Sequence, residues 1–87
     1  MDPKTHFSTP DDYADWINTR IREEVLRRRE AAGISAYALA AACGVSDQTI
    51  LNLEHGKCDR GSLTGTLARI AFYFGITLEE LIAAAAA

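Results

Sequence analysis

The stretch GVSDQTILNLEHG, residues 44–56, constrains the fold of this chain more than any other segment. Ser46 can cap a helix at its start, and Gly56 can end that helix, because glycine readily adopts the left-handed conformation that often follows one. Ile50 and Leu53 lie three residues apart, so they share one helical face that can pack against a neighbour. The segment therefore predicts a short amphipathic helix whose opposite face is polar.

A second short helix is expected directly before this one. Ser35 can cap the sequence AYALAAAC, in which Leu39 and the small residue Ala40 face inward. Gly44 then permits the positive φ of a sharp turn. Two helices joined by a three-residue turn that contains glycine form a helix-turn-helix unit, which we place at about residues 35–56.

Caps and apolar stripes predict three further helices. Thr9 followed by Pro10 is typical of a helix start, apolar residues then recur every four positions from Tyr13 to Val25, and Gly33 ends this helix. Another helix is expected to begin at Ser62, and Thr77 can cap the last one. No segment alternates apolar and polar residues, so we expect an all-α fold with five helices.

The two ends of the chain differ from the region between them. Residues 1–8 are poor in apolar side chains and are predicted to form a flexible tail, which leaves residues 9–82 as the domain. Residues 83–87 are all alanine. This low-complexity tail is either a helical extension or a place where alanines stand in for unassigned side chains.

Length and charge exclude several classes of protein. The 87 residues suffice for one small domain, and the formal net charge of −3 excludes a global positive field that would attract nucleic acid. Any contact with DNA must therefore come from a local patch. We find no signal peptide and no apolar run of membrane-spanning length, so we expect a cytoplasmic protein with no membrane partner.

The chain carries no arrangement typical of an enzyme. There is no nucleophile–base constellation, no phosphate-binding glycine loop and no room for a sizeable pocket. Cys43 and Cys58 do not form a zinc-binding spacing with His6 or His55. We therefore expect two reduced thiols, no metal, no cofactor and no catalytic activity.

From about Ile21 to Ile82 the sequence resembles the lambda-repressor-like, Cro/CI-type (Xre) helix-turn-helix regulators. The residues that carry the resemblance are Ile21, Val25, Arg29, Gly33-Ile34-Ser35, Leu39-Ala40, Gly44-Val45-Ser46, Thr49-Ile50, Glu54, Gly56-Lys57, Leu67, Ile70-Ala71, Gly75-Ile76, Leu78 and Glu80-Leu81. The resemblance implies a compact five-helix domain, here with an N-terminally extended first helix. It also implies that the third helix enters the DNA major groove, usually in a symmetric dimer.

The polar face of that third helix contains the candidates for reading DNA bases. Gln48 and Asn52 can pair bidentately with adenine, the methyl group of Thr49 can meet a thymine methyl, and Asp47 can accept from cytosine. Contacts to phosphates set the affinity of a protein for DNA and its position on the duplex. These contacts must come from residues outside the base-reading face. Our candidates for phosphate contacts are Ser35, Tyr37, Ser46, His55, Lys57 and Arg60.

Other residues are assigned structural or assembly roles. Arg29 and Glu54 resemble the family's buried ion pair, which joins the first helix to the end of the third. Apolar residues on the first and last helices form a candidate dimer surface: Tyr13, Trp16, Ile17, Leu78, Leu81 and Ile82. The alternative is that the extended first helix packs on the fifth. Arg22, Arg27 and Arg28 are either a solvated face or further contacts to DNA.

Together these features predict a sequence-specific transcriptional regulator of bacterial or phage origin, associated with the nucleoid. We expect a repressor that reads a palindromic operator in double-stranded DNA as a homodimer, with the helix at residues 46–55 in the major groove. The alternative is a partner-binding protein, such as an antitoxin bound to a toxin or an antagonist of another regulator. The acidic net charge, Asp47 and the region around Trp16 support this alternative.

Overall fold

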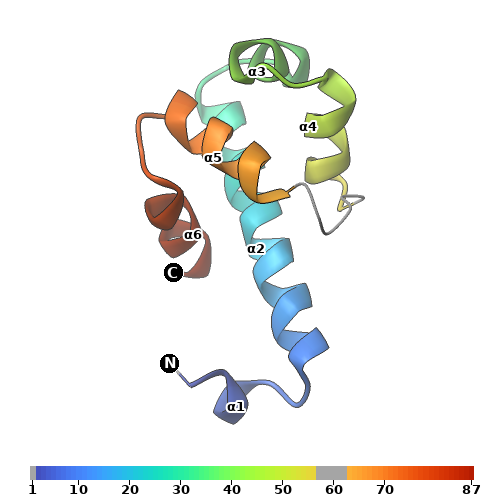
Figure 1. Cartoon of the computed structure of the whole chain (residues 1–87), viewed down its shortest axis with the longest axis vertical. Helices are drawn as coiled ribbons and strands as arrows, with labels where there is room; N and C mark the ends of the chain where they lie inside the picture. The colour runs from blue at the N-terminus through green and yellow to red at the C-terminus, as the bar shows by residue number, and fades with distance from the viewer. Residues whose placement is uncertain (1, 57–62) are drawn as a thin grey trace.

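The computed structural model describes residues 2–56 and 63–87, and these residues form an all-α fold, as predicted (Figure 1). The helices within this part of the chain are α1 (Pro3–His6), α2 (Pro10–Ala31), α3 (Ala36–Cys43), α4 (Asp47–Glu54), α5 (Leu63–Tyr73) and α6 (Leu78–Ala86). The five predicted helices correspond to α2–α6. None of the described helices is long and apolar enough to cross a membrane.

Side-chain caps begin the helices at the predicted residues. The hydroxyls of Thr9, Ser35 and Ser46 each accept a hydrogen bond from the backbone N–H three residues further on. Thr77 and Glu80 form the reciprocal capping box expected at the start of α6. Because each cap satisfies a backbone donor that the helix leaves unpaired, it sets where the helix starts. The cap predicted at Ser62 lies outside the described residues.

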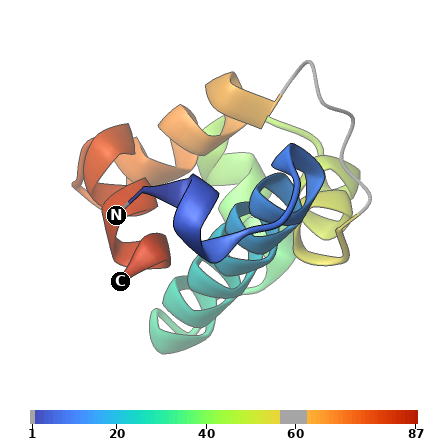
Figure 2. The same cartoon turned by 90° about the horizontal axis from the view of Figure 1, so that it is seen from below.

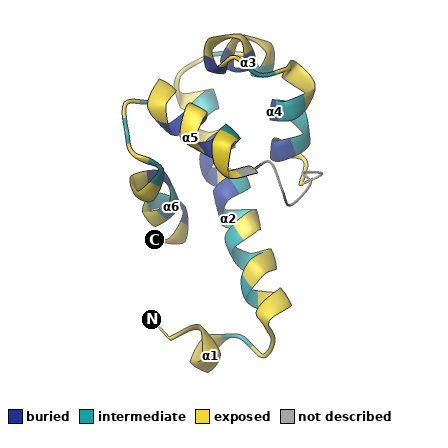
Figure 3. Ribbon diagram, in the orientation of Figure 1, coloured by how far each residue is buried: buried dark blue, intermediate teal, exposed yellow. Residues whose placement is uncertain are grey.

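One apolar core holds α2–α6 together. Each of these helices contributes one of the largest fully buried side chains, which are Val25, Leu39, Ile50, Ile70 and Leu81. Figure 3 shows the buried residues on the sides of the helices that face one another. The short helices α3 and α4 are thus stabilised mainly by packing, since isolated helices of this length are marginal in water.

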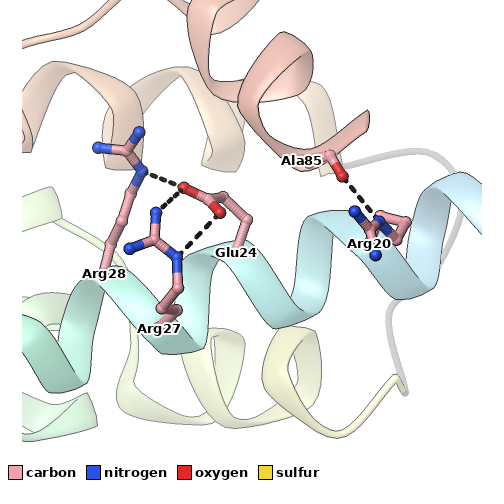
Figure 4. Close-up of polar contacts among 5 residues, drawn as sticks. All are labelled: Arg20, Glu24, Arg27, Arg28 and Ala85. Carbon is pink, nitrogen blue, oxygen red and sulfur yellow. Dashed lines mark hydrogen bonds and ion pairs between the residues drawn. The ribbon is translucent and has the colours of Figure 1, made fainter. Parts of the chain in front are cut away.

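The C-terminal helix α6 packs along α2 (Figures 1 and 4). Leu81 is 0% exposed, and Arg20 Nε donates to the Ala85 carbonyl at 2.9 Å. The assignment of Leu81 to a dimer surface is therefore wrong, because its own chain buries it. Ile17, Leu78 and Ile82 are also partly covered by the core. The structure thus has the alternative arrangement, in which the extended first predicted helix packs on the last one. The alanine-rich end of the chain takes part in this packing, since Ala85 is buried in the core.

The N-terminal half of α2 extends beyond the core, as predicted, and α1 folds back beside it (Figure 1). In both views α1 lies on the side of α2 where α6 lies (Figure 2). Phe7 contacts the rings of Tyr13 and Trp16, with centroid separations of 5.2 Å and 5.5 Å. The segment expected to be a flexible tail thus contains one helical turn, followed by an aromatic side chain that partly covers the predicted dimer surface.

Glu24 on α2 is a buried carboxylate that binds two arginines (Figure 4). Arg27 donates to it through Nε and Nη2, and Arg28 Nε donates to Oε2 at 2.6 Å. The hydrogen bond from Arg27 lowers the pKa of Glu24 below its ordinary 4.5; burial opposes this, and the hydrogen bond from Arg28 adds to it. The three side chains therefore form a compact charged cluster on one helix.

This pKa shift predicts a loss of stability in acid. Because the folded state holds the pKa of Glu24 below its unfolded value, the stabilisation is fully present above about pH 5 and is lost as pH falls through the folded pKa. Urea denaturation across this range should show a falling free energy of unfolding, with a weaker pH dependence in Glu24→Gln. The exposed neighbour variant Glu23→Gln is the control. An unchanged acid dependence in Glu24→Gln would contradict the assignment.

Candidate nucleic-acid interface

The turn between α3 and α4 fixes how α4 is presented. Gly44 has φ +72°, the left-handed conformation predicted for it, and the N–H of Val45 donates to the Ala40 carbonyl at 3.0 Å. Arg69 on α5 donates through Nη1 to the carbonyl of Cys43 at 3.1 Å. The start of α4 is thus constrained by three features: its Ser46 cap, the hydrogen bond that ends α3, and the contact from Arg69 on α5.

The apolar side of α4 is buried and its polar side is open. Ile50 and Leu53 belong to the core, whereas Asp47 and Gln48 are exposed and Asn52 is partly exposed. In Figure 1, α4 lies at the edge of the molecule, with no described segment across its outer side. The residues expected to read bases therefore share a surface that the described part of the chain leaves uncovered.

Two hydrogen bonds organise this polar face. Gln48 Nε2 donates to Asn52 Oδ1 at 2.8 Å, one helical turn further along. The hydroxyls of Thr49 and Ser46 lie 2.8 Å apart. The carboxamide of Gln48 keeps one carbonyl acceptor and one N–H donor beyond its bond to Asn52. That combination matches the N6 donor and N7 acceptor of adenine.

The described candidates for phosphate contacts are all accessible. Ser35, Tyr37, Ser46 and His55 are exposed. Ser35 accepts a hydrogen bond as a helix cap, so its hydroxyl proton remains available for another acceptor, whereas the hydroxyl of Ser46 also shares a hydrogen bond with that of Thr49. The two basic candidates, Lys57 and Arg60, lie outside the described residues, as does Cys58.

Arg29 and Glu54 form the ion pair that the family resemblance implied. Arg29 Nε and Nη2 donate to the two carboxylate oxygens at 2.6 Å and 3.0 Å, and Nη1 donates to the Ile34 carbonyl at 3.0 Å. The bond to Glu54 raises the pKa of Arg29. This bidentate pair joins the end of α2 to the end of α4, so Arg29 supports the site from within.

The sequence allowed the other arginines of α2 to form either a solvated face or further contacts to DNA. In the structure they contact groups of their own chain. Arg27 and Arg28 bind Glu24, so their charges are already partly compensated. The guanidinium of Arg22 lies against Gly56, where a Cβ atom would collide with it. Spacings of three and four residues from Glu24 were a signal for its two partners, whereas nothing in the sequence indicated the contact of Arg22.

The described residues contain no group of three or more histidine, cysteine or acidic side chains that could hold a metal ion. Burial raises the pKa of the Cys43 thiol, although the charge of Arg69 partly opposes this shift. A raised pKa keeps the thiol protonated, and the thiolate is the reactive form. The buried Cys43 therefore behaves as a core residue.

In comparisons with known proteins, the segment that matches a family model is longer than the helix-turn-helix unit and contains it. A family model described as a Cro/C1-type HTH DNA-binding domain matches residues 24–86. This range includes α3–α6 and the C-terminal part of α2, while α1 and the projecting part of α2 precede it. No curated protein and no solved structure matches the chain.

Proposed function

Since the chain belongs to the family of Cro/C1-type helix-turn-helix DNA-binding domains, it is a DNA-binding regulator, and we propose that it represses transcription by binding a palindromic operator as a homodimer. In this proposal α4 lies in the major groove. The observation that carries it is the polar face of α4, which is open on one side and anchored by buried residues on the other. A rigid helix with free amide groups is what direct reading of base edges requires.

The amide pair on α4 suggests which base is read. Asn52 holds the carboxamide of Gln48 at 2.8 Å, so the remaining donor and acceptor of Gln48 are oriented before DNA arrives. We assign adenine to Gln48 and a neighbouring thymine methyl to Thr49. Asp47 accepts from a cytosine amino group in the same proposal.

Charge is the reason for proposing a dimer. The net charge is −3, and most of the described arginines already bind groups of their own chain. One copy therefore brings few cations to phosphates, which predicts weak binding with a small salt dependence. Two copies double the contacts. Their recognition helices would enter successive major grooves about 34 Å apart, and a bound dimer represses by covering the operator.

Gln48→Ala tests this proposal on DNA selected by the purified protein from random sequences. We expect the variant to lose about 1–3 kcal/mol of binding free energy on the selected site, with little change on random DNA. The matched control is Asn18→Ala, which removes an exposed carboxamide from the projecting part of α2. Gel shifts at fixed salt measure both. An equal loss on selected and random DNA would remove Gln48 from base reading.

A further inference from the structure

One arginine of α2 keeps a charge that no described group of the chain binds. The described arginines that donate hydrogen bonds to carboxylates or backbone carbonyls are Arg20, Arg27, Arg28, Arg29 and Arg69. Arg22 forms no hydrogen bond and no ion pair with the residues that the structure describes, and it is only half-buried. In a chain with a net charge of −3, this guanidinium is therefore a cation that remains available to a partner outside the chain.

Arg22 lies against the end of α4, the helix that we propose reads bases. A Cβ atom at Gly56, two residues beyond α4, would collide with Nη1 of Arg22 and would lie 3.5 Å from its Cζ. The guanidinium therefore packs on the backbone of Gly56. Since Gly56 also has φ +73°, a glycine at this position both permits the turn that follows α4 and makes room for the arginine.

Arg22 and Arg29 share one face of α2, because about two helical turns separate them. Both side chains thus meet the C-terminal end of α4, but their charges are compensated to different degrees. Arg29 binds the full negative charge of Glu54. Among the described groups Arg22 faces the helix end itself, which carries a partial charge of about −0.5. Net positive charge is therefore left at Arg22.

The dimensions of the major groove bring this end of α4 close to phosphates. The groove is about 12 Å wide, and a helix with its side chains is about 10–12 Å in diameter, so α4 fills it. The eight residues of α4 span about 12 Å, so groups beside either end of the helix lie near the edges of the groove. Ser46 serves the N-terminal end of α4, and Arg22 has the corresponding place at the C-terminal end.

We infer that Arg22 binds a DNA phosphate beside the C-terminal end of α4. The inference rests on the proposed function, because it requires α4 to lie in the major groove. A guanidinium suits this role, since its planar N–H groups can bind two phosphate oxygens at once. Arg22 precedes residues 24–86, the range that the family model matches, so this contact comes from a part of the chain outside that match.

The salt dependence of DNA binding tests the inference. Each phosphate contact releases counterions and contributes about 0.9 to the slope of log K against log salt concentration. Arg22→Gln should therefore reduce the slope by about 0.9 per bound copy and weaken binding about eightfold per copy at about 0.1 M salt. The loss should be equal on selected and random DNA. Arg22→Lys keeps the charge and should keep most of the slope. Fluorescence anisotropy of a labelled duplex between about 50 and 200 mM salt measures both quantities.

Arg27→Gln is the matched control, because it removes an arginine charge from the same helix. Arg27 is bound to Glu24, so this variant should keep the wild-type slope. Arg22 has no hydrogen bond to lose within the described residues, so Arg22→Gln should keep the wild-type circular dichroism spectrum and urea midpoint. A wild-type slope in Arg22→Gln, or a loss of affinity confined to the selected site, would overturn the inference, because Arg22 would then act only by supporting α4.

The same titrations separate this contact from the proposed function. Equal affinity of the wild type for selected and random DNA, with a shallower slope in Arg22→Gln, would support the phosphate contact and contradict operator reading. A clear preference of the wild type for the selected site, with an unchanged slope in Arg22→Gln, would support the proposed function and overturn the contact.

Discussion

Replacing Arg29 with methionine is expected to lower the free energy of unfolding by about 3 kcal/mol. The side chains of Arg29 and Glu54 are only 18% and 4% exposed, and the pair makes two short hydrogen bonds. Removing the guanidinium leaves the Glu54 carboxylate buried without its partner, and the desolvation of that charge is then uncompensated. Urea denaturation at neutral pH measures the loss.

The double variant Arg29→Met/Glu54→Leu tests whether the loss of stability comes from the unpaired charge of Glu54 or from the loss of the Arg29 side chain itself. Because it removes both charges, it should recover at least half of the stability that Arg29→Met loses. Arg27→Met is a matched control, since Arg27 is a solvent-exposed arginine whose partner Glu24 keeps Arg28. Its loss should be much smaller. If Arg29→Met were as stable as wild type, the pair would not be what joins α2 to α4.

Replacing Leu53 with aspartate should unfold the domain. Leu53 is 4% exposed and belongs to the core on the inner face of α4. The substitution removes apolar burial worth about 2 kcal/mol and forces a carboxylate into the core or out of a packed position. The penalty for burying an unpaired charge is several kcal/mol, so the two losses together remove most of the about 4–13 kcal/mol that stabilises a domain of this size. Circular dichroism should show lost helicity.

Two substitutions on α4 are controls: one alters the buried side chain without adding a charge, and the other adds a carboxylate at an exposed position. Leu53→Met keeps the side-chain volume and should cost less than about 1.5 kcal/mol. Gln48→Asp adds the same charge on the exposed face and should leave the protein folded, because that face is open to water. Retained helicity and cooperative melting in Leu53→Asp would mean that the buried face of α4 is wrongly assigned.

The helices α2–α6 could be predicted because local chemistry and packing agree along most of the chain. The caps at Thr9, Ser35, Ser46 and Thr77 act on neighbouring backbone groups, so short sequence patterns suffice to find them. Gly44 could be predicted for the same reason, since few other residues adopt its backbone conformation without strain. The helix α1 has only four residues and no periodic pattern, so it could not be predicted from the sequence.

Which apolar residues face solvent could not be predicted as well. Leu81 and Phe72 both lie on amphipathic helices, yet one is fully buried and the other is 86% exposed. Their positions depend on how α6 lies along α2 and on what packs against α5, and both are tertiary contacts. Phe72 lies off the stripe formed by Leu67, Ile70 and Phe74, which is the signal that could have identified it.

The residues that make up the candidate site could be predicted from the sequence, but the hydrogen bonds and ion pairs among them could not. The pattern around Gly44 placed Gln48 and Asn52 on one helical face, and the structure leaves that face open. The hydrogen bond between these two amides and the use of Arg27 and Arg28 by Glu24 are choices among competing partners. A sequence pattern permits several such pairings, and only the folded geometry selects one.

Nuclear magnetic resonance titration of the protein with its selected operator tests most directly whether α4 contacts DNA. Backbone amide signals report the environment of each residue, so the largest shifts mark the bound surface. We predict the largest changes in Asp47–Glu54 and at the start of α3, with small changes in the projecting part of α2. Large shifts confined to α2 or α6, with α4 unperturbed, would contradict the assignment of α4 as the reading helix.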